Sequence, residues 1–302
     1  MSLEHQHRDR ETRAKALLVV PLLALAGLIA TTRALAQDPT VAPADQYRAL
    51  LQEFRKTARS LYEATTDEQR GTSATNMAAL SQRFLSWAES NANHAMAPDC
   101  LVHVVIQELW LENNTAFPGR QDSLQDRAIT LLLQNHIDSA QLADGCTRMS
   151  FGFGKQCETF LRTVLARSPR REVQGVACLR LAQFLHGRLR RLDLLSVQPE
   201  TTARYERLFG KAHLDELRRL DRTAAMKEIE TIFERAASEF GDVKLPYDLE
   251  VGQTARSELH EIRHLCVGKQ APELEGQDQH GEPVRLGDYR GKVVLLYFWS
   301  EH

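Results

Sequence analysis

The stretch MKEIETIFERAASEFG, residues 226–241, has the pattern of an amphipathic helix. Its apolar residues recur at intervals of three and four, which places them on one face of a helix with 3.6 residues per turn. They are Met226, Ile229, Phe233, Ala236 and Phe240. Gly241 follows where a helix C-cap favours glycine. The stretch therefore predicts a helix that Gly241 ends.

Stripes with the same period occupy most of the chain on either side. They fall at residues 47–61, 77–87, 102–109, 124–132, 160–165, 173–185 and 255–262. We expect the helix that starts near Val173 to end near Gly187, and Thr254 to cap the last helix. The basic run 188–191 would then be a solvated C-terminal helix end, where the helix dipole favours cations. The alternative is a patch that binds anions or a membrane.

Helices joined by short loops predict a mainly α fold, with residues 45–265 arranged as helical hairpins or as an α-solenoid. Residues 233–240, FERAASEF, resemble the second helix of a tetratricopeptide unit, although no exact period recurs along the chain. We expect this domain to fold without the residues that follow it, because its apolar stripes are continuous.

The first 36 residues have the pattern of a secretory signal. Four basic residues between 8 and 15 precede the apolar run 16–30, and Ala34-Leu35-Ala36 forms a small-x-small cleavage site before Gln37. An uncleaved membrane anchor is the alternative, but the run is shorter than the roughly 20 residues that a span prefers. We predict a signal peptide at 1–36, a linker at 37–44 and no membrane span after cleavage.

The formal net charge of −2 gives no indication of a nucleic-acid partner. Export would place the five cysteines in an oxidising compartment, and none of them forms a Cys-x-x-Cys. Cys146 and Cys157 flank the short sequence SFGFG at 150–154 and could close a small disulfide ring. The alternative is that all five are small buried core residues.

Only the last 37 residues, 266–302, change period. The run VVLLYFW at 293–299 is continuously apolar and rich in β-branched and aromatic residues, which predicts a buried central strand. Before it, a turn at 281–282 precedes the short predicted strand PVRL at 283–286, and DYRG at 288–291 connects the two.

In order and spacing, four short sequences resemble the opening of a thioredoxin-like redoxin domain of the TlpA and AhpC/TSA type. They are VGKQAPEL at 267–274, DQHGEPVRL at 278–286, DYRGK at 288–292 and VVLLYFW at 293–299. The resemblance implies an incomplete α/β domain at 266–302 and a chemistry of thiol–disulfide exchange or antioxidant peroxide reduction. It also implies a protein thiol, a protein disulfide or a thioredoxin-type reductant as partner, and no cofactor. In the family the redox Cys-x-x-Cys follows three residues after Phe-Trp, so here it is expected just after His302.

The sequence HEIRH at 260–264 resembles the zinc-binding helix of zincin proteases, and His94 and His103 lie near Asp99 and Cys100. The sequence HEIRH lies at the end of its predicted helix, and no third ligand can be identified after it. We therefore predict no metal site. Cys266 precedes the redoxin segment at the wrong end of a helix dipole, so we assign no catalytic residue among residues 1–302.

Two functional hypotheses follow. The first is a truncated, exported thiol–disulfide oxidoreductase of the bacterial periplasm or cell envelope, inactive as given because its redox cysteines are missing. The second is a helical-repeat module that binds proteins in the envelope and carries a vestigial redoxin tail.

The first prediction concerns export. We expect cleavage after Ala36, because a charged start, an apolar run and a small-x-small site occur in that order. Mass spectrometry of the protein from its host should find Gln37 at the N-terminus. Recovery of chains that begin at Met1 from the membrane fraction would support the anchor instead.

Overall fold

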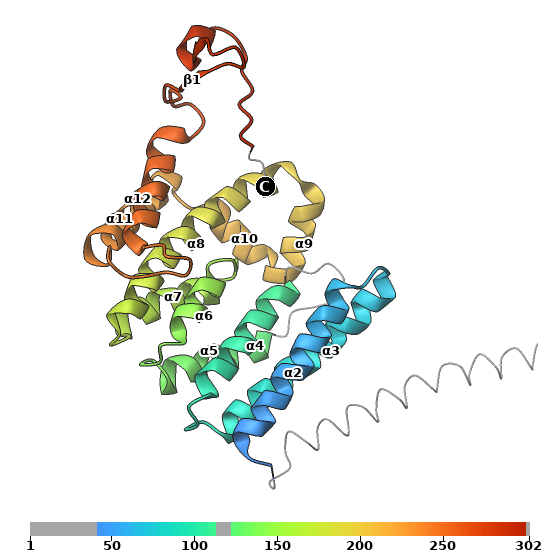
Figure 1. Ribbon diagram of the computed structural model, residues 1–302. Coiled ribbons are helices and arrows are strands. Elements are labelled where there is room, and N and C mark those ends of the chain that lie inside the picture. Colours follow the sequence, from blue (N-terminus) through green and yellow to red (C-terminus); the bar gives the residue numbers. More distant parts are fainter. Residues whose placement is uncertain (1–40, 113–121, 300–302) are drawn as a thin grey trace, which may run out of the picture.

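The computed structural model describes residues 41–112 and 122–299, and its helices form a layered array below a small hairpin (Figure 1). In chain order the helices are α2 (Pro43–Tyr62), α3 (Asp67–Ser90), α4 (Ala97–Glu112), α5 (Asp122–Asn135), α6 (Leu142–Met149), α7 (Lys155–Arg167), α8 (Arg171–Val197), α9 (Pro199–Phe209), α10 (Lys211–Arg218), α11 (Arg222–Glu239) and α12 (Val251–His260). The predicted mainly α fold is confirmed. The predicted signal peptide and the predicted linker up to residue 40 lie outside the described residues.

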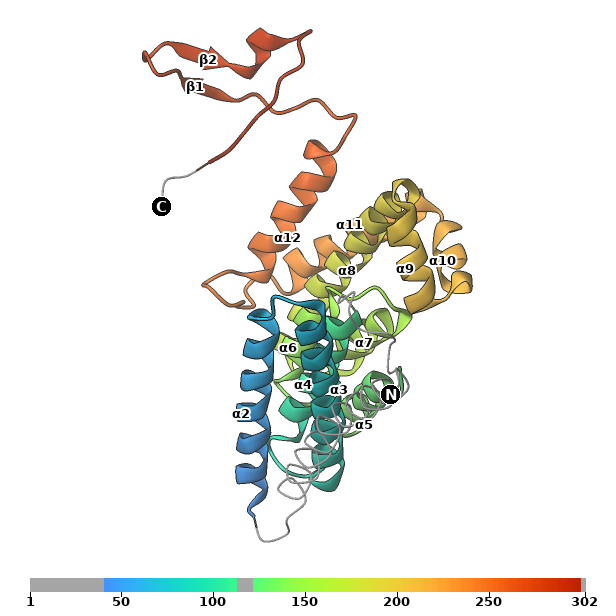
Figure 2. The same cartoon turned by 90° about the vertical axis from the view of Figure 1, so that its right-hand side faces the viewer.

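Most helices pack against a neighbour in the chain. Helix α3 lies between α2 and α4, α5 and α6 contact α4, α6 and α7 contact α8, and α11 lies between α8 and α12. Antiparallel neighbours of this kind follow from short connections between helices whose apolar faces need cover. Figure 2 shows α9 and α10 as a separate arm beside α8.

Helix α8 is longer than the sequence predicted, and the expected end near Gly187 is wrong. The helix continues to Val197 because Leu189, Leu192 and Leu195 extend the buried stripe against the rest of the core. An isolated glycine costs a helix only about 1 kcal/mol, which this burial offsets. The basic run 188–191 therefore lies inside the helix and is not a solvated end.

The start of α12 also differs from the prediction. Glu250 is the N-cap and Thr254 lies within the helix, where its hydroxyl donates to the carbonyl oxygen of Glu250 at 2.9 Å. Helix α11 ends as predicted just before Gly241, with Phe240 as its C-cap and Gly241 as the next residue. Gly241 also faces Gly252, whose added Cβ would lie 2.7 Å from the Gly241 Cα. The two glycines let the loop after α11 and the start of α12 meet at backbone distance.

The sequence analysis missed α6, α9 and α10, which are short or carry few buried residues. In the C-terminal segment the strands are β1 (Glu275–Gln277) and β2 (Pro283–Arg285), which pair antiparallel. The strand predicted at 283–286 is thus confirmed, whereas β1 was missed. The prediction of a central strand at 293–299 is wrong, since that run pairs with no strand among the described residues.

The contact between Gly241 and Gly252 gives the second prediction. Gly252→Ala should lower the free energy of unfolding by about 1–3 kcal/mol, because the new methyl group meets backbone that cannot move cheaply. Gly187→Ala is the matched control within α8, where an added Cβ meets nothing within 4 Å. It should raise stability by about 0.5–1 kcal/mol. Urea denaturation followed by circular dichroism measures both, and equal effects would contradict the close approach.

Candidate functional site

The C-terminal segment is the candidate site, and it begins with a hairpin that local hydrogen bonds hold in place. Strand β1 pairs with β2 so that Gly276 faces Val284. The carboxylate of Asp278 accepts hydrogen bonds from the backbone N–H groups of His280 at 2.7 Å and Glu282 at 3.0 Å. Gly281 has a φ of 83°, which suits glycine in a tight turn. The turn predicted at 281–282 is therefore confirmed.

A second carboxylate fixes the connector that follows. The 3-10 turn η2 (Leu286–Tyr289) starts directly after β2, and Glu273 accepts a hydrogen bond from the backbone N–H of Gly287 at 2.7 Å. The backbone N–H of Leu286 donates to the carbonyl oxygen of Leu274 at 2.9 Å. These contacts shape the segment before the apolar run without help from the helices.

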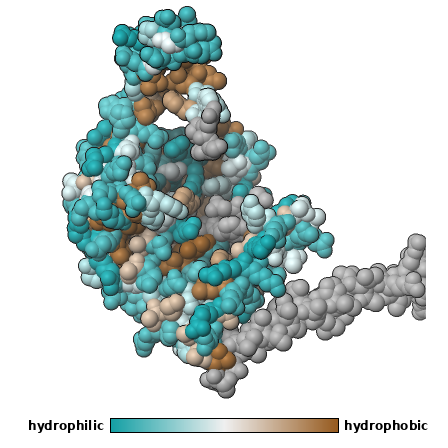
Figure 3. All heavy atoms as spheres, viewed as in Figure 1, coloured by the Kyte–Doolittle hydropathy of each residue, from teal (hydrophilic) through white to brown (hydrophobic). Residues whose placement is uncertain are grey.

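The apolar run 293–299 is the part of the site that would precede a redox centre, and it lies in solvent. Leu295 is 92% exposed and Phe298 is 80% exposed. In the space-filling view, apolar residues form a brown band directly below the hydrophilic hairpin (Figure 3). A strand with this composition needs a sheet neighbour and cover on both faces, and the described residues supply neither.

Four of the five cysteines are buried and one is exposed. Burial raises the pKa of Cys100 and Cys146 well above the usual value of a thiol, and raises that of Cys178 to about 12. Such thiols are poor nucleophiles because the thiolate is the reactive form. The alternative of buried core cysteines therefore holds for four of them and fails for Cys266, which is exposed.

The possible disulfide between Cys146 and Cys157 is not formed in the structure. Both side chains are fully buried thiols, Cys146 on α6 and Cys157 on α7, in the main hydrophobic core. Between them, Phe153 is buried against Tyr205 and Phe209, so the connecting loop is packed and not open. The bridge stays a prediction for an oxidising compartment.

The histidines do not assemble a metal centre in the part of the chain that the structure describes. His260, the last residue of α12, and His264, in the π-helix η1 (Glu261–Leu265) that follows it, are exposed with ring centroids 4.9 Å apart. The ring of His103 stacks on Phe84 and lies tilted against Phe54, and burial lowers the pKa of His103. Asp99 accepts a hydrogen bond from the Tyr47 hydroxyl. These groups have structural partners.

The basic run has partners as well. Arg188 pairs with Glu158 at 2.5 Å, and Arg191 donates to the carbonyl oxygens of Gly152 at 2.8 Å and Phe151 at 2.9 Å. Burial by itself would raise the pKa of Glu158, but Arg188 and Arg162 outweigh it and hold that pKa below its usual value. Two of the cations in this run therefore attach α8 to α7 and to the loop after α6.

The comparisons with known proteins concern the same C-terminal segment. Residues 267–302 match the AhpC/TSA family. The chain is similar to peroxiredoxin Bcp of Bacillus subtilis (strain 168), with 52% identity over 35 residues, which are 12% of this chain and 22% of that protein. The chain thus spans about a fifth of the curated relative that it matches. No solved structure matches it. The C-terminal segment is a fragment of a thioredoxin-like redoxin domain.

The exposed run generates the third prediction. Replacing Leu295 and Tyr297 by lysine should reduce self-association of the chain, because exposed apolar strands pair with one another. The control replaces Gln279 and Glu282 in the hairpin turn by lysine, which adds charge but leaves the run intact. Light scattering coupled to gel filtration measures the mass of each variant. If both pairs change the mass equally, charge and not the apolar run governs association.

Proposed function

We propose that this chain is part of an exported redoxin in which a helical domain precedes a domain of thiol-dependent disulfide or peroxide reduction. The match of residues 267–302 to the AhpC/TSA family carries the proposal. The exposed run at 293–299 supports it, because its composition suits the buried strand that leads to a redox centre.

The chemistry needs two thiols placed after that strand. A thiolate at a helix N-terminus attacks a substrate disulfide, forms a mixed disulfide and releases one substrate sulfur as a thiolate. The resolving thiolate then attacks the mixed disulfide, which releases the second substrate sulfur. The two electrons that reduce the substrate leave the protein pair oxidised, so a protein or small-molecule thiol must reduce it again.

The cysteines of the 302-residue chain are unsuited to this task. Four are buried, no two of the five have Cys-x-x-Cys spacing, and Cys266, which lies after the C-terminal end of α12, has no second cysteine near it in the sequence. We therefore propose that the 302-residue chain is inactive as a reductase.

For the location we propose the periplasm or cell envelope of a bacterium, reached through the signal at 1–36. The charged start, the apolar run and the Ala-Leu-Ala site support export. The described helices include none with the length and apolar character that a bilayer crossing needs.

A second candidate function is a helical interaction module. The main core of the helical part extends from Tyr47 to Ile262 and includes no residue of 267–299. The helices can therefore keep their structure whatever follows them, as a module that binds a partner would require.

The fourth prediction tests the redoxin proposal. The 302-residue chain should reduce neither insulin disulfides nor hydrogen peroxide above the background of a heat-denatured sample. Extension after His302 by the family segment that begins with Cys-x-x-Cys should restore reduction, because it supplies both thiols. The matched control is the same extension with both new cysteines changed to serine.

Two results would contradict this proposal. Activity of the 302-residue chain that disappears on Cys266→Ser would make Cys266 the nucleophile. An extended chain that folds but reduces neither substrate would favour the interaction module.

A further inference from the structure

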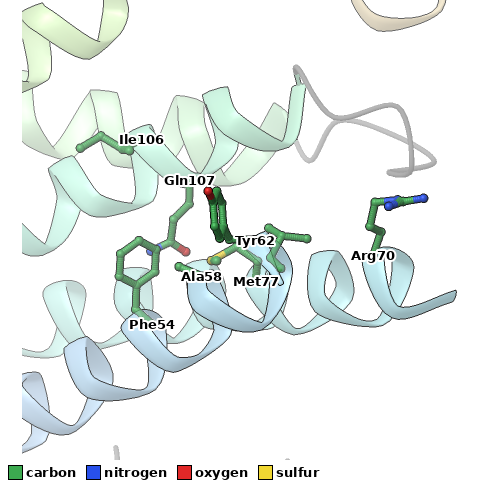
Figure 4. Close-up of a pocket in the computed structure, with 8 residues that line it drawn as sticks. Phe54, Ala58, Tyr62, Arg70, Met77, Ile106 and Gln107 are labelled. Atoms are coloured by element: carbon green, nitrogen blue, oxygen red, sulfur yellow. The ribbon is translucent and has the colours of Figure 1, made fainter. Parts of the chain in front are cut away.

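A pocket of about 350 Å³ lies between α2, α3 and α4, on the helical part of the chain. In Figure 4, Phe54 and Ala58 of α2, Met77 of α3 and Gln107 of α4 lie close together, while Arg70 lies apart on the right. Its inner wall is apolar and comes from Phe54, Ala58, Met77 and Ile106. Met77 belongs to a small hydrophobic cluster separate from the main core, so the pocket lies between this cluster and the main core. The volume falls within the range of small-molecule sites.

One polar group interrupts this wall. Gln107 of α4 lines the pocket and is only 2% exposed. Its Oε1 accepts a hydrogen bond from the Ser81 hydroxyl at 2.9 Å, while its Nε2 has no hydrogen-bond partner among the described residues. A buried amide N–H without an acceptor costs about 1–3 kcal/mol. A ligand that supplies an acceptor for the Gln107 amide N–H would explain why this residue occupies the position.

We propose that this pocket binds an acyl compound, whose hydrocarbon chain lies along Phe54, Met77 and Ile106 and whose ester or ketone carbonyl oxygen accepts from Gln107 Nε2. A neutral carbonyl fits because a carboxylate beside one neutral donor would stay largely unpaired, which is costly in an apolar site. The unpaired group inside the pocket, Nε2 of Gln107, is a hydrogen-bond donor, so the ligand group that matches it is an acceptor.

The same reasoning disfavours a peptide. A peptide that offers a carbonyl oxygen to Gln107 also brings backbone N–H groups, which need acceptors of their own once buried. The oxygen of Gln107 is already engaged by Ser81, and the wall around it is hydrocarbon. An ester carries acceptors only, and leaves no donor unsatisfied.

The rim suits the polar end of such a molecule. Arg70 and Tyr62 line the pocket, and Tyr62 is 92% exposed at the end of α2. Arg70 pairs with Asp67 at 2.7 Å and donates to the carbonyl oxygen of Ala64 at 3.3 Å. An exposed ion pair of this kind stabilises the fold by less than about 1 kcal/mol. Arg70 could therefore leave Asp67 and donate to a polar head group at little cost in free energy.

The experiment compares two probes that differ in one carbonyl group, 1-decanoylglycerol and its ether 1-decylglycerol, each below its micelle concentration. The full chain carries 13C-methyl methionine, and the methyl signal of Met77 reports on the pocket. Met149, which is buried in the main core, is the internal reference. Both probes should shift the Met77 signal and not the Met149 signal. The ester should bind about fivefold to tenfold more tightly, as one neutral hydrogen bond allows.

The variants separate the hydrogen bond from the cavity. Gln107→Met keeps the length of the side chain and should bring the ester and ether affinities within twofold of each other. Ala58→Phe fills the pocket and should abolish the shift with both probes, whereas Ala203→Phe on the exposed face of α9 is its matched control and should not. Leu295→Lys, in the exposed apolar run, should also leave the ester preference unchanged.

The proposal fails in either of two ways. If Met77 does not respond to the ester in the unsubstituted chain, the pocket is not the binding site. If ester and ether bind that chain equally, Gln107 does not recognise a carbonyl group. Both results come from the unsubstituted chain and hold even if a variant does not fold.

Discussion

Burial of α8, most complete between Val173 and Leu185, is the constraint on which the other helices depend. Its buried residues include Val176, Leu181 and Phe184, and it contacts α6, α7, α9, α11 and α12. A helix segment that is buried on most of its sides must be covered by several neighbours, and each fully buried Leu or Phe contributes about 1.5–3 kcal/mol. Gly175 lets one neighbour come close, since an added Cβ there would lie 2.9 Å from Val243.

The charges on α8 follow from the same constraint. Arg188 and Arg191 follow the most buried part of α8, and both find partners within the protein. Glu158 and the carbonyl oxygens of residues 151 and 152 provide them. A buried ion pair is costly to break, because the remaining charge is left without a partner in a poorly solvated place. These contacts therefore fix the position of α7 and of the loop after α6 relative to α8.

The C-terminal segment shows the opposite case, in which local chemistry is satisfied and long-range packing is not. Asp278 and Glu273 hold a hairpin and a turn by bonds to nearby backbone N–H groups. The run at 293–299 has no such local device, since a central strand takes its hydrogen bonds and its cover from distant parts of the chain. This contrast supports a redoxin domain of which only a fragment is described. The pocket beside Gln107 is a property of the helical part alone.

The sequence by itself determined the mainly α class, most helix positions, the strand at 283–285 and the redoxin character of residues 267–302. These features rest on apolar period, turn residues and motif spacing, all of which are local. Only the tertiary structure decided that α8 passes through Gly187, since the burial of Leu189 and Leu192 outweighs the propensity of one glycine. It also decided that Gly241 and Gly252 meet, and that Gln107 faces an apolar pocket with its amide N–H unsatisfied. A polar residue on a helix is common, and its meaning depends on which neighbours surround it, which no local pattern encodes.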